Sequence, residues 1–318
     1  MPEVKEQQNN AVQHEGSAQA VEAVSNTEAQ SSKEGSAGTG TEAQAGGKEE
    51  IVTENTLFAE PIIHFKNFTI TNSLINSWVA IFIILILAVI VRFKIKAIPR
   101  GIQNVFEMVI EGFLGIFDSV TGSREKSLKF FPLVFSFFIL ILINNWLGLL
   151  PGVGSVGQVV SEHGEKVFIP FLRGGTADLN TTLALAIIGV VVSHIFGVIA
   201  LGWWEYLNKF INIKAFLEIP KKIKEDPTVL VVNPIKALVG LIEIISELAK
   251  VASLSFRLFG NIFAGEVLLA SMAAILAFVL PVPFMFLEVI VGLIQALIFS
   301  MLILAYLTMN TTSHEEEH

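Results

Sequence analysis

The sequence LSFRLFGNIFAGEVLL, from Leu254 to Leu269, sets one arginine and one glutamate inside a long apolar run. These residues are Arg257 and Glu266. A guanidinium stays protonated at any accessible pH, so it cannot enter hydrocarbon as a neutral group. A charge at the bilayer centre costs about 3 kcal/mol on insertion scales and roughly 10–17 kcal/mol on an isolated helix in simulation. Because such residues usually serve a function, the stretch predicts a functional site within a membrane protein.

The composition agrees with a chain that crosses the membrane several times. Hydrophobic residues make up 53% of the 318 residues, charged residues make up 16%, and the mean hydropathy is +0.65. Soluble domains carry about 25% charged residues. The net charge of −8 arises mostly before residue 56, and the remainder is close to neutral, so nothing indicates nucleic-acid binding. No cysteine is present, which excludes disulfides and thiolate chemistry.

Five apolar runs are long enough to cross a bilayer, which predicts an all-α integral membrane fold. A hydrocarbon core about 30 Å thick requires about 20 helical residues. We expect a membrane domain over 57–309 with helices at about 74–91, 130–150, 181–203, 236–280 and 284–309. The fourth run is about twice the necessary length. It must therefore tilt, break or lie partly in the membrane plane.

The two ends of the chain are polar. Residues 1–56 carry glutamate, glutamine, glycine and serine and no aromatic residue, which predicts a disordered acidic tail. This tail is either a tether for a partner or a dispensable extension. Residues 310–318 are expected to form a cytoplasmic tail. His314 to His318 match the HExxH zinc-protease pattern, but without a third ligand beyond them we expect no metal site.

Basic residues predict the orientation. One cluster follows the first span and a second follows the third span: Arg92, Lys94, Lys96 and Arg100, then Lys209, Lys214, Lys221, Lys222 and Lys224. By the positive-inside rule both loops are cytoplasmic, which puts the N-terminus outside and the C-terminus in the cytoplasm. Between the first two spans, residues 101–120 have the spacing of an amphipathic helix. It lies at the cytoplasmic interface or packs as a loop helix on other spans.

A polar stripe follows the fourth run through Arg257. At 100° per residue its other members fall within about 40° of Arg257: Glu243, Ser246, Lys250, Ser253 and Asn261. The first three of these fit a solvated cytoplasmic end. Glu266 falls on the opposite face, about 13 Å further along the axis, so we do not expect it to pair with Arg257. The alternative to function, for both charges, is structural pairing with groups on other helices.

A fixed cation at mid-depth predicts ion transfer along two half-paths. It would favour the ionised form of a carboxylate supplied by a neighbouring protein and would block direct leakage. Glu266 and Glu288 can be protonated reversibly, so we expect them to carry protons from the outside. Further polar residues are candidates for lining the half-channels: Ser253, Asn144, Asn145, Asp178 and Asn180. The two adjacent asparagines could instead bond neighbouring helices.

The sequence resembles subunit a of the F-type ATP synthase, the stator partner of the rotating ring of c subunits. The match is carried by SFRLFGN at Ser255–Asn261, AGE at Ala264–Glu266, and Gln295 with Ala296 and Phe299. Residues 144–151 and 176–180 support it. The resemblance extends from about Phe58 to the C-terminus and does not include the acidic tail.

This resemblance implies a subunit that is not an enzyme by itself and that couples proton flow to rotation of the c-ring. It implies that Arg257 faces the ring carboxylate with Asn261 beside it, that Glu266 and Glu288 line the outer half-channel, and that Gln295 supports Arg257. It also implies a tilted hairpin of the last two helices and a location in the cell's inner (plasma) membrane. The implied partners are the c-ring, the peripheral-stalk b subunits and the lipid bilayer, with no cofactor.

Several points stay open. A self-contained secondary transporter, with Arg257 binding an anionic substrate, and a non-conducting scaffold are alternative functions. Transporters often contain two related halves, and the Arg257 motif is not repeated. The coupling ion, H⁺ or Na⁺, is undetermined. Gln295 can lie beside Arg257 only if the fourth helix unwinds before Pro281 or the two arms of the hairpin are offset.

Overall fold

The structure, a computed structural model, describes residues 51–52, 56, 58–65, 68–94, 101–162, 165–211, 229–276 and 279–312. The expected acidic tail up to residue 50, the HExxH match and the basic residues from Lys214 to Lys224 lie outside these ranges. The described residues are mainly helical, and five of their helices are long and apolar enough to cross a membrane. The expectation of an all-α membrane fold is therefore confirmed.

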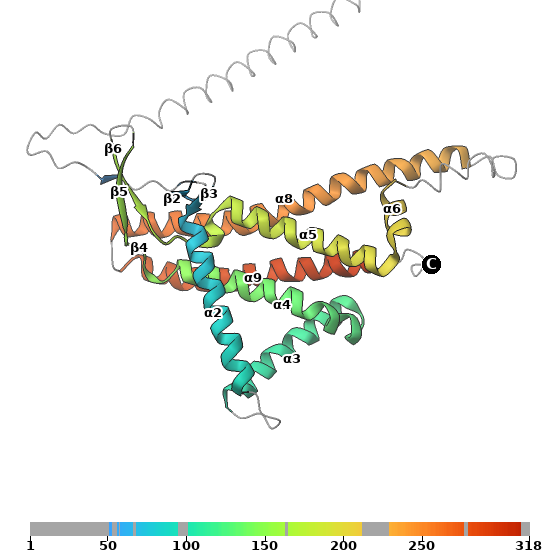
Figure 1. The fold of residues 1–318 in the computed structure, drawn as a ribbon, viewed down its shortest axis with the longest axis horizontal. Helices are drawn as coiled ribbons and strands as arrows, with labels where there is room; N and C mark the ends of the chain where they lie inside the picture. The colour runs from blue at the N-terminus through green and yellow to red at the C-terminus, as the bar shows by residue number, and fades with distance from the viewer. Residues whose placement is uncertain are drawn as a thin grey trace, which may run out of the picture. The chain divides into compact units, whose positions relative to one another are not determined.

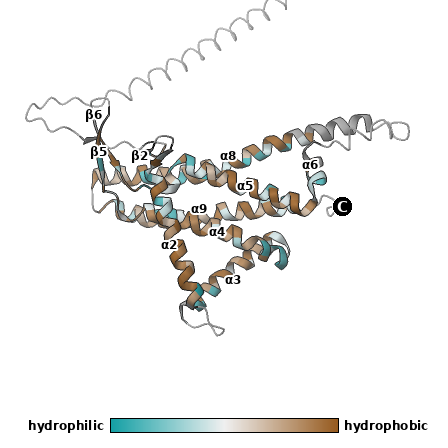
Figure 2. Ribbon diagram, in the orientation of Figure 1, coloured by the Kyte–Doolittle hydropathy of each residue, from teal (hydrophilic) through white to brown (hydrophobic). Residues whose placement is uncertain are grey.

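The five long helices are apolar along most of their length (Figures 1 and 2). They are α2 (Asn72–Lys94), α4 (Arg124–Gly148), α5 (Leu179–Leu201), α8 (Val229–Ile275) and α9 (Pro281–Thr311). Three shorter helical segments connect them: α3 (Ile102–Thr121), η1 (Gly175–Ala177) and α6 (Trp203–Ile211).

Two small sheets lie outside the long helices. Strands β2 (Pro61–Phe65) and β3 (Phe68–Thr71) form an antiparallel hairpin that leads into α2. Between α4 and α5, β4 (Pro151–Gly154) is followed by the antiparallel pair β5 (Gly157–Glu162) and β6 (Glu165–Pro170). Strand β1 (Ile51–Val52) runs parallel to β6. The connection between the predicted helices at 130–150 and 181–203 is thus largely structured.

The core is formed mainly by α4, α5, α8 and α9. Their most buried apolar side chains form one cluster that includes Val134, Ile141, Leu258, Ile303 and Leu304. Helix α4 runs antiparallel to α9, because Asn145 contacts Gly292 while Phe137, further toward its start, contacts Phe299. These contacts fix the depth of every polar group on α9 relative to α4.

Helix α3 packs on α4, in agreement with one of the two placements predicted for it. Phe113 and Phe117 pack against aromatic rings of α4, and Phe117 is fully buried. Toward the start of the helix, Val105 and Met108 are exposed. One end of α3 therefore packs on the bundle, while the other end presents apolar side chains outward.

The connection between α8 and α9 answers the question left open by the sequence. Helix α8 ends at Ile275, six residues before α9 begins with Pro281 in its first turn. The two helices then meet where Glu288 lies against Gly265. Arg257 is about 12 Å along α8 from Gly265, and Gln295 is about 10 Å along α9 from Glu288. In an antiparallel pair these offsets put Arg257 and Gln295 at nearly the same depth.

Candidate functional site

Polar residues gather at three depths along α8. Glu266 lies about 13 Å along the axis on one side of Arg257, and Glu247 lies about 15 Å on the other side. Each of these residues faces different neighbours. We refer to the three depths as the Glu266 level, the Arg257 level and the Glu247 level.

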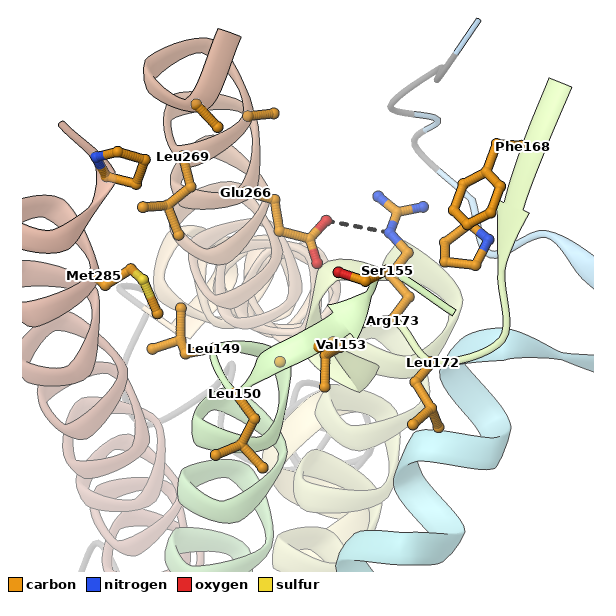
Figure 3. Close-up of a pocket in the computed structure, with 18 of the residues that line it drawn as sticks. Leu149, Leu150, Val153, Ser155, Phe168, Leu172, Arg173, Glu266, Leu269 and Met285 are labelled. Carbon is orange, nitrogen blue, oxygen red and sulfur yellow. Dashed lines mark hydrogen bonds and ion pairs between the residues drawn. The ribbon is translucent and has the colours of Figure 1, made fainter. Parts of the chain in front are cut away.

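At the Glu266 level the carboxylate is bound by an arginine from the loop before η1. Arg173 Nε donates to Glu266 Oε2 at 3.1 Å, and both side chains are largely removed from solvent. They face a cavity of about 550 Å³ whose wall is mostly apolar, with Leu149, Leu269 and Met285 among its lining residues. Figure 3 shows the ion pair directed across this cavity. Glu266 and Arg173 are therefore both part of the cavity wall.

Glu288 enters the same level from α9. It is buried, and its carboxylate lies against the backbone of Gly265, the residue next to Glu266. A Cβ at position 265 would come within 2.3 Å of Glu288 Oε1. Because Gly265 has no side chain, Glu288 of α9 fits against α8 next to Glu266. Two acidic residues from different helices therefore lie at the same level.

The polar motifs near the ends of α4 and α5 bond the helices to one another. Asn145 Nδ2 donates to the Gly292 carbonyl oxygen at 2.9 Å, and its Oδ1 accepts from Thr176 Oγ1 at 2.5 Å. Asn144 accepts from Ser77 Oγ of α2 at 3.2 Å. Both asparagines are buried. They serve as links between helices, which was one of the two expectations for them.

Asp178 is the N-cap of α5 and is buried. One carboxylate oxygen accepts from Ser73 at 3.0 Å and from Thr181 at 3.1 Å, and the other accepts from the Asn180 backbone N–H at 3.1 Å. These bonds satisfy the carboxylate and join α2 to the start of α5. Asn180 itself is exposed at this helix end.

At the Arg257 level the guanidinium is exposed on an apolar helix face. Phe256 beside it is 60% exposed. Arg257 Nη2 donates to Ser253 Oγ at 3.3 Å, and among the described residues no carboxylate pairs with it. Several other exposed residues near this face are small or polar: Ser246, Ala249, Ser253, Gly260, Asn261 and Ala264. Gln295, half-buried on α9, has no hydrogen bond with Arg257 in the described part of the chain.

At the Glu247 level four helices contribute polar side chains. Glu247 accepts from Lys250 at 2.7 Å and lies 3.4 Å from His194 Nε2 of α5. Lys250 lies over the ring of Tyr306, 5.0 Å from its centroid. The sequence predicts a solvated helix end at Lys250. In the structure Lys250 instead contacts Glu247 and the ring of Tyr306.

Tyr206 of α6 completes this level by bonding His194 Nδ1. Burial, followed by the nearby charges of Glu247 and Glu243, raises the pKa of Tyr206 above its ordinary value. The phenol therefore keeps its proton, and its contact with Nδ1 joins α6 to α5 beside Glu247.

Three of these residues are absent from the sequence predictions: Arg173, His194 and Glu247. Glu247 lies outside the stripe drawn through Arg257, so the helical angle did not select it. His194 is a lone histidine in an apolar span and had no partner within reach in sequence. Arg173 lies 93 residues from Glu266. The only feature of the sequence that could have pointed to Arg173 is that a basic residue occurs in the loop between the second and third spans, which is predicted to lie outside.

Comparisons with known proteins identify similar chains. The family model described as ATP synthase A chain matches residues 74–308, from the start of α2 to near the end of α9. The chain is 31% identical over 248 residues to ATP synthase subunit a of Moorella thermoacetica, which covers 77% of this chain and 93% of that protein. It is 34% identical over 243 residues to ATP synthase subunit a of Syntrophobacter fumaroxidans, covering 76% and 85%. For the subunit a of Geobacter sulfurreducens the identity is 33% over 242 residues, covering 76% and 87%.

Proposed function

Since this chain belongs to the ATP synthase subunit a family and is a multi-pass component of the membrane sector, we propose that it conducts ions through two half-channels separated by Arg257. In this proposal the subunit catalyses no reaction alone. It faces the ring of c subunits, contacts the peripheral-stalk b subunits, and acts with the other subunits of the synthase. Ion flow through the two half-channels turns the ring.

The observation that carries the proposal is the state of Arg257. It is a permanent charge on the outward face of an apolar span, and no carboxylate of the described chain neutralises it. A buried or membrane-embedded cation needs an opposite charge, because the uncompensated group is costly in hydrocarbon. A titrating carboxylate on the adjacent ring meets this need. The small residues around Arg257 allow a neighbouring helix to approach closely.

The two half-channels are assigned to the two other levels. The Glu266 level opens on a cavity and contains Glu288, so it forms the outer half-channel through which protons reach the ring. The Glu247 level and the exposed Ser253 form the inner half-channel, while Asn261 lies beside Arg257 on its outer side. The basic loops after the first and third spans support this orientation, since by the positive-inside rule they predict an N-terminus outside the plasma membrane and a C-terminus in the cytoplasm.

The secondary-transporter alternative has less support. It requires Arg257 to hold an anionic substrate in an enclosed site, as ligand pockets normally bury most of their ligand. Arg257 is exposed, and the 550 Å³ cavity is lined by Glu266 and Arg173 and not by Arg257.

Cysteine cross-linking tests which face of α8 meets the ring. In the complete synthase, Ser253→Cys and Asn261→Cys are expected to cross-link efficiently to a cysteine placed near the titrating carboxylate of the c subunit. Ser255→Cys is the matched control. It begins from the same residue type two positions away, but Ser255 is 1% exposed and lies near Thr182 of α5. Equal yields at Ser253 and Ser255, in assembled enzyme, would contradict the proposed face.

A second test concerns the room that Gly265 makes for Glu288. Gly265→Ala is expected to displace the Glu288 carboxylate and to slow ATP-driven proton pumping by about tenfold, since misplacing a reacting group by about 1 Å can cost up to 100-fold. Alanine favours the helix by about 1 kcal/mol over glycine, so lost helix stability cannot explain the defect. Pumping is measured with a pH-sensitive dye in inverted vesicles.

Gly112→Ala is the control for Gly265→Ala. Gly112 is also helical, and a Cβ there meets no atom within 4 Å, so pumping should not change. Combining Gly265→Ala with Glu288→Asp shortens the acidic side chain and should recover part of the lost rate. Normal pumping by Gly265→Ala alone would remove Glu288 from the proposed half-channel.

A further inference from the structure

Arg173 is the residue on which this inference depends. It lies in the loop between β6 and η1 and is 9% exposed. Its guanidinium is the cation that contacts Glu266, and the pair lies in the wall of the cavity (Figure 3). A buried arginine is rare unless its charge is paired, so the Glu266 contact compensates both residues.

The guanidinium is held in place by residues that precede α2. Its Nη2 donates to the Thr56 carbonyl oxygen at 2.8 Å, and Nη1 donates to Thr56 Oγ1 and to the Phe58 carbonyl oxygen, both at 3.3 Å. These bonds occupy the far side of the planar group and leave Nε directed at Glu266. The rigid fork of donors in arginine suits such a fixed arrangement better than the single ammonium of lysine.

The backbone next to Arg173 also approaches the carboxylate. A Cβ on Gly174 would lie 3.1 Å from Glu266 Oε1, which is closer than ordinary contact. The charged and titratable groups that face this region from the described elements are Arg173, Glu60 before β2, and Glu288 on α9. Among the described residues, Arg173 is thus the cation that lines the cavity beside two carboxylates, Glu60 and Glu266, while Glu288 lies against Gly265 next to them.

We infer that Arg173 is a positioning residue for ion uptake: it holds the ionised carboxylate of Glu266 at the cavity wall and sets the pH range over which the carboxylate accepts a proton. The inference rests on the proposed outer half-channel. A proton arriving from the cavity must compete with the guanidinium for the carboxylate. Removing that competitor eases protonation, so uptake then occurs at higher pH.

The test uses Arg173→Gln and Arg173→Lys in the complete synthase reconstituted in vesicles. The rate of ATP synthesis is measured while the pH on the cavity side is varied and the opposite pH and the membrane potential are held constant. For Arg173→Gln the midpoint of this profile should move up by about one pH unit, since an adjacent opposite charge typically accounts for one to three units. Arg173→Lys keeps the charge but not the fork, and should give a smaller shift in the same direction.

Arg124→Gln is the matched control. Arg124 also pairs with a carboxylate, Asp118 at 2.8 Å, but this pair is exposed at the junction of α3 and α4. Removing this ion pair should leave the pH midpoint of ATP synthesis unchanged. A lower maximal rate for Arg173→Gln without a shifted midpoint would make Arg173 merely structural and overturn the inference. Failure of both Arg173 variants to assemble would do the same.

Glu266→Gln separates this inference from the proposed function. If Glu266→Gln pumps at the normal rate, the half-channel role of Glu266 fails, and the role of Arg173 fails with it. If Glu266→Gln is slow while the profile of Arg173→Gln stays in place, the half-channel stands and only the inference about Arg173 is lost.

Discussion

Replacing Arg257 with alanine is expected to abolish ATP synthesis driven by an ion gradient while the complex still assembles. The side chain is on an exposed helix face, so its removal opens no cavity in the core and should change stability by less than about 0.5 kcal/mol. In the proposed mechanism, however, its charge is the group that meets the ring carboxylate. Losing one such preorganised group in a water-excluded site commonly costs two to three orders of magnitude, so synthesis should fall to roughly 1% or less.

Two variants make the Arg257 experiment specific. Arg257→Lys keeps a positive charge but loses the planar fork, and should remain severely impaired. Ser253→Ala removes the hydroxyl that accepts from Arg257 and should keep most of the activity. Assembly is checked by co-purification of the c-ring and by ATP hydrolysis in the bound enzyme. Ion-driven synthesis at the normal rate in Arg257→Ala would eliminate the proposed mechanism.

Glu266→Gln is expected to give the second largest effect, a fall of at least about tenfold in proton uptake from the cavity side, since a positioned proton-transferring group typically contributes 100-fold or more. Glutamine has the same shape and its amide oxygen can still accept from Arg173. Arg173 also keeps its bonds to Thr56 and Phe58. The variant should therefore assemble, and its defect should lie in ion transfer.

The control for Glu266→Gln is the same substitution at Glu111. That glutamate is exposed on α3 and lines neither proposed half-channel. Both variants are measured as ATP-driven pumping in inverted vesicles and as synthesis after an imposed pH jump. A Glu266→Gln enzyme that matches the Glu111→Gln enzyme in both assays would show that protons enter by another route.

Most of the helical fold could be predicted, because a bilayer demands long apolar segments and these are visible in sequence. The helix ends could not. The apolar run predicts a helix from residue 130, yet α4 begins at Arg124, since a helix can continue beyond the hydrocarbon segment into the interface. The pair β5 and β6 was also missed. Its two runs rich in valine and isoleucine on either side of His163-Gly164 were a usable hairpin signal.

Some features of the polar groups could also be predicted from the sequence, and others could not. Helical angles separate Arg257 from Glu266 correctly onto opposite faces, because both lie on one continuous helix whose geometry is regular. The partner of Glu266 could not be found by any period, because Arg173 comes from a loop 93 residues away. Likewise, only the packing of α4 against α9 reveals that Asn145 bonds a backbone oxygen.

Helix α9 is held near both ends by its neighbours. Asn145 and Trp146 of α4 donate to the Gly292 and Val289 carbonyl oxygens, and Asn310 donates to Ser193 of α5. In the proposed mechanism a rotor that turns against α8 exerts a sideways force, and the stationary subunit must oppose it with equal torque. Because α9 lies behind α8 and is joined to two further helices, that reaction force passes into the whole bundle, and a single helix does not have to bear it in fluid lipid.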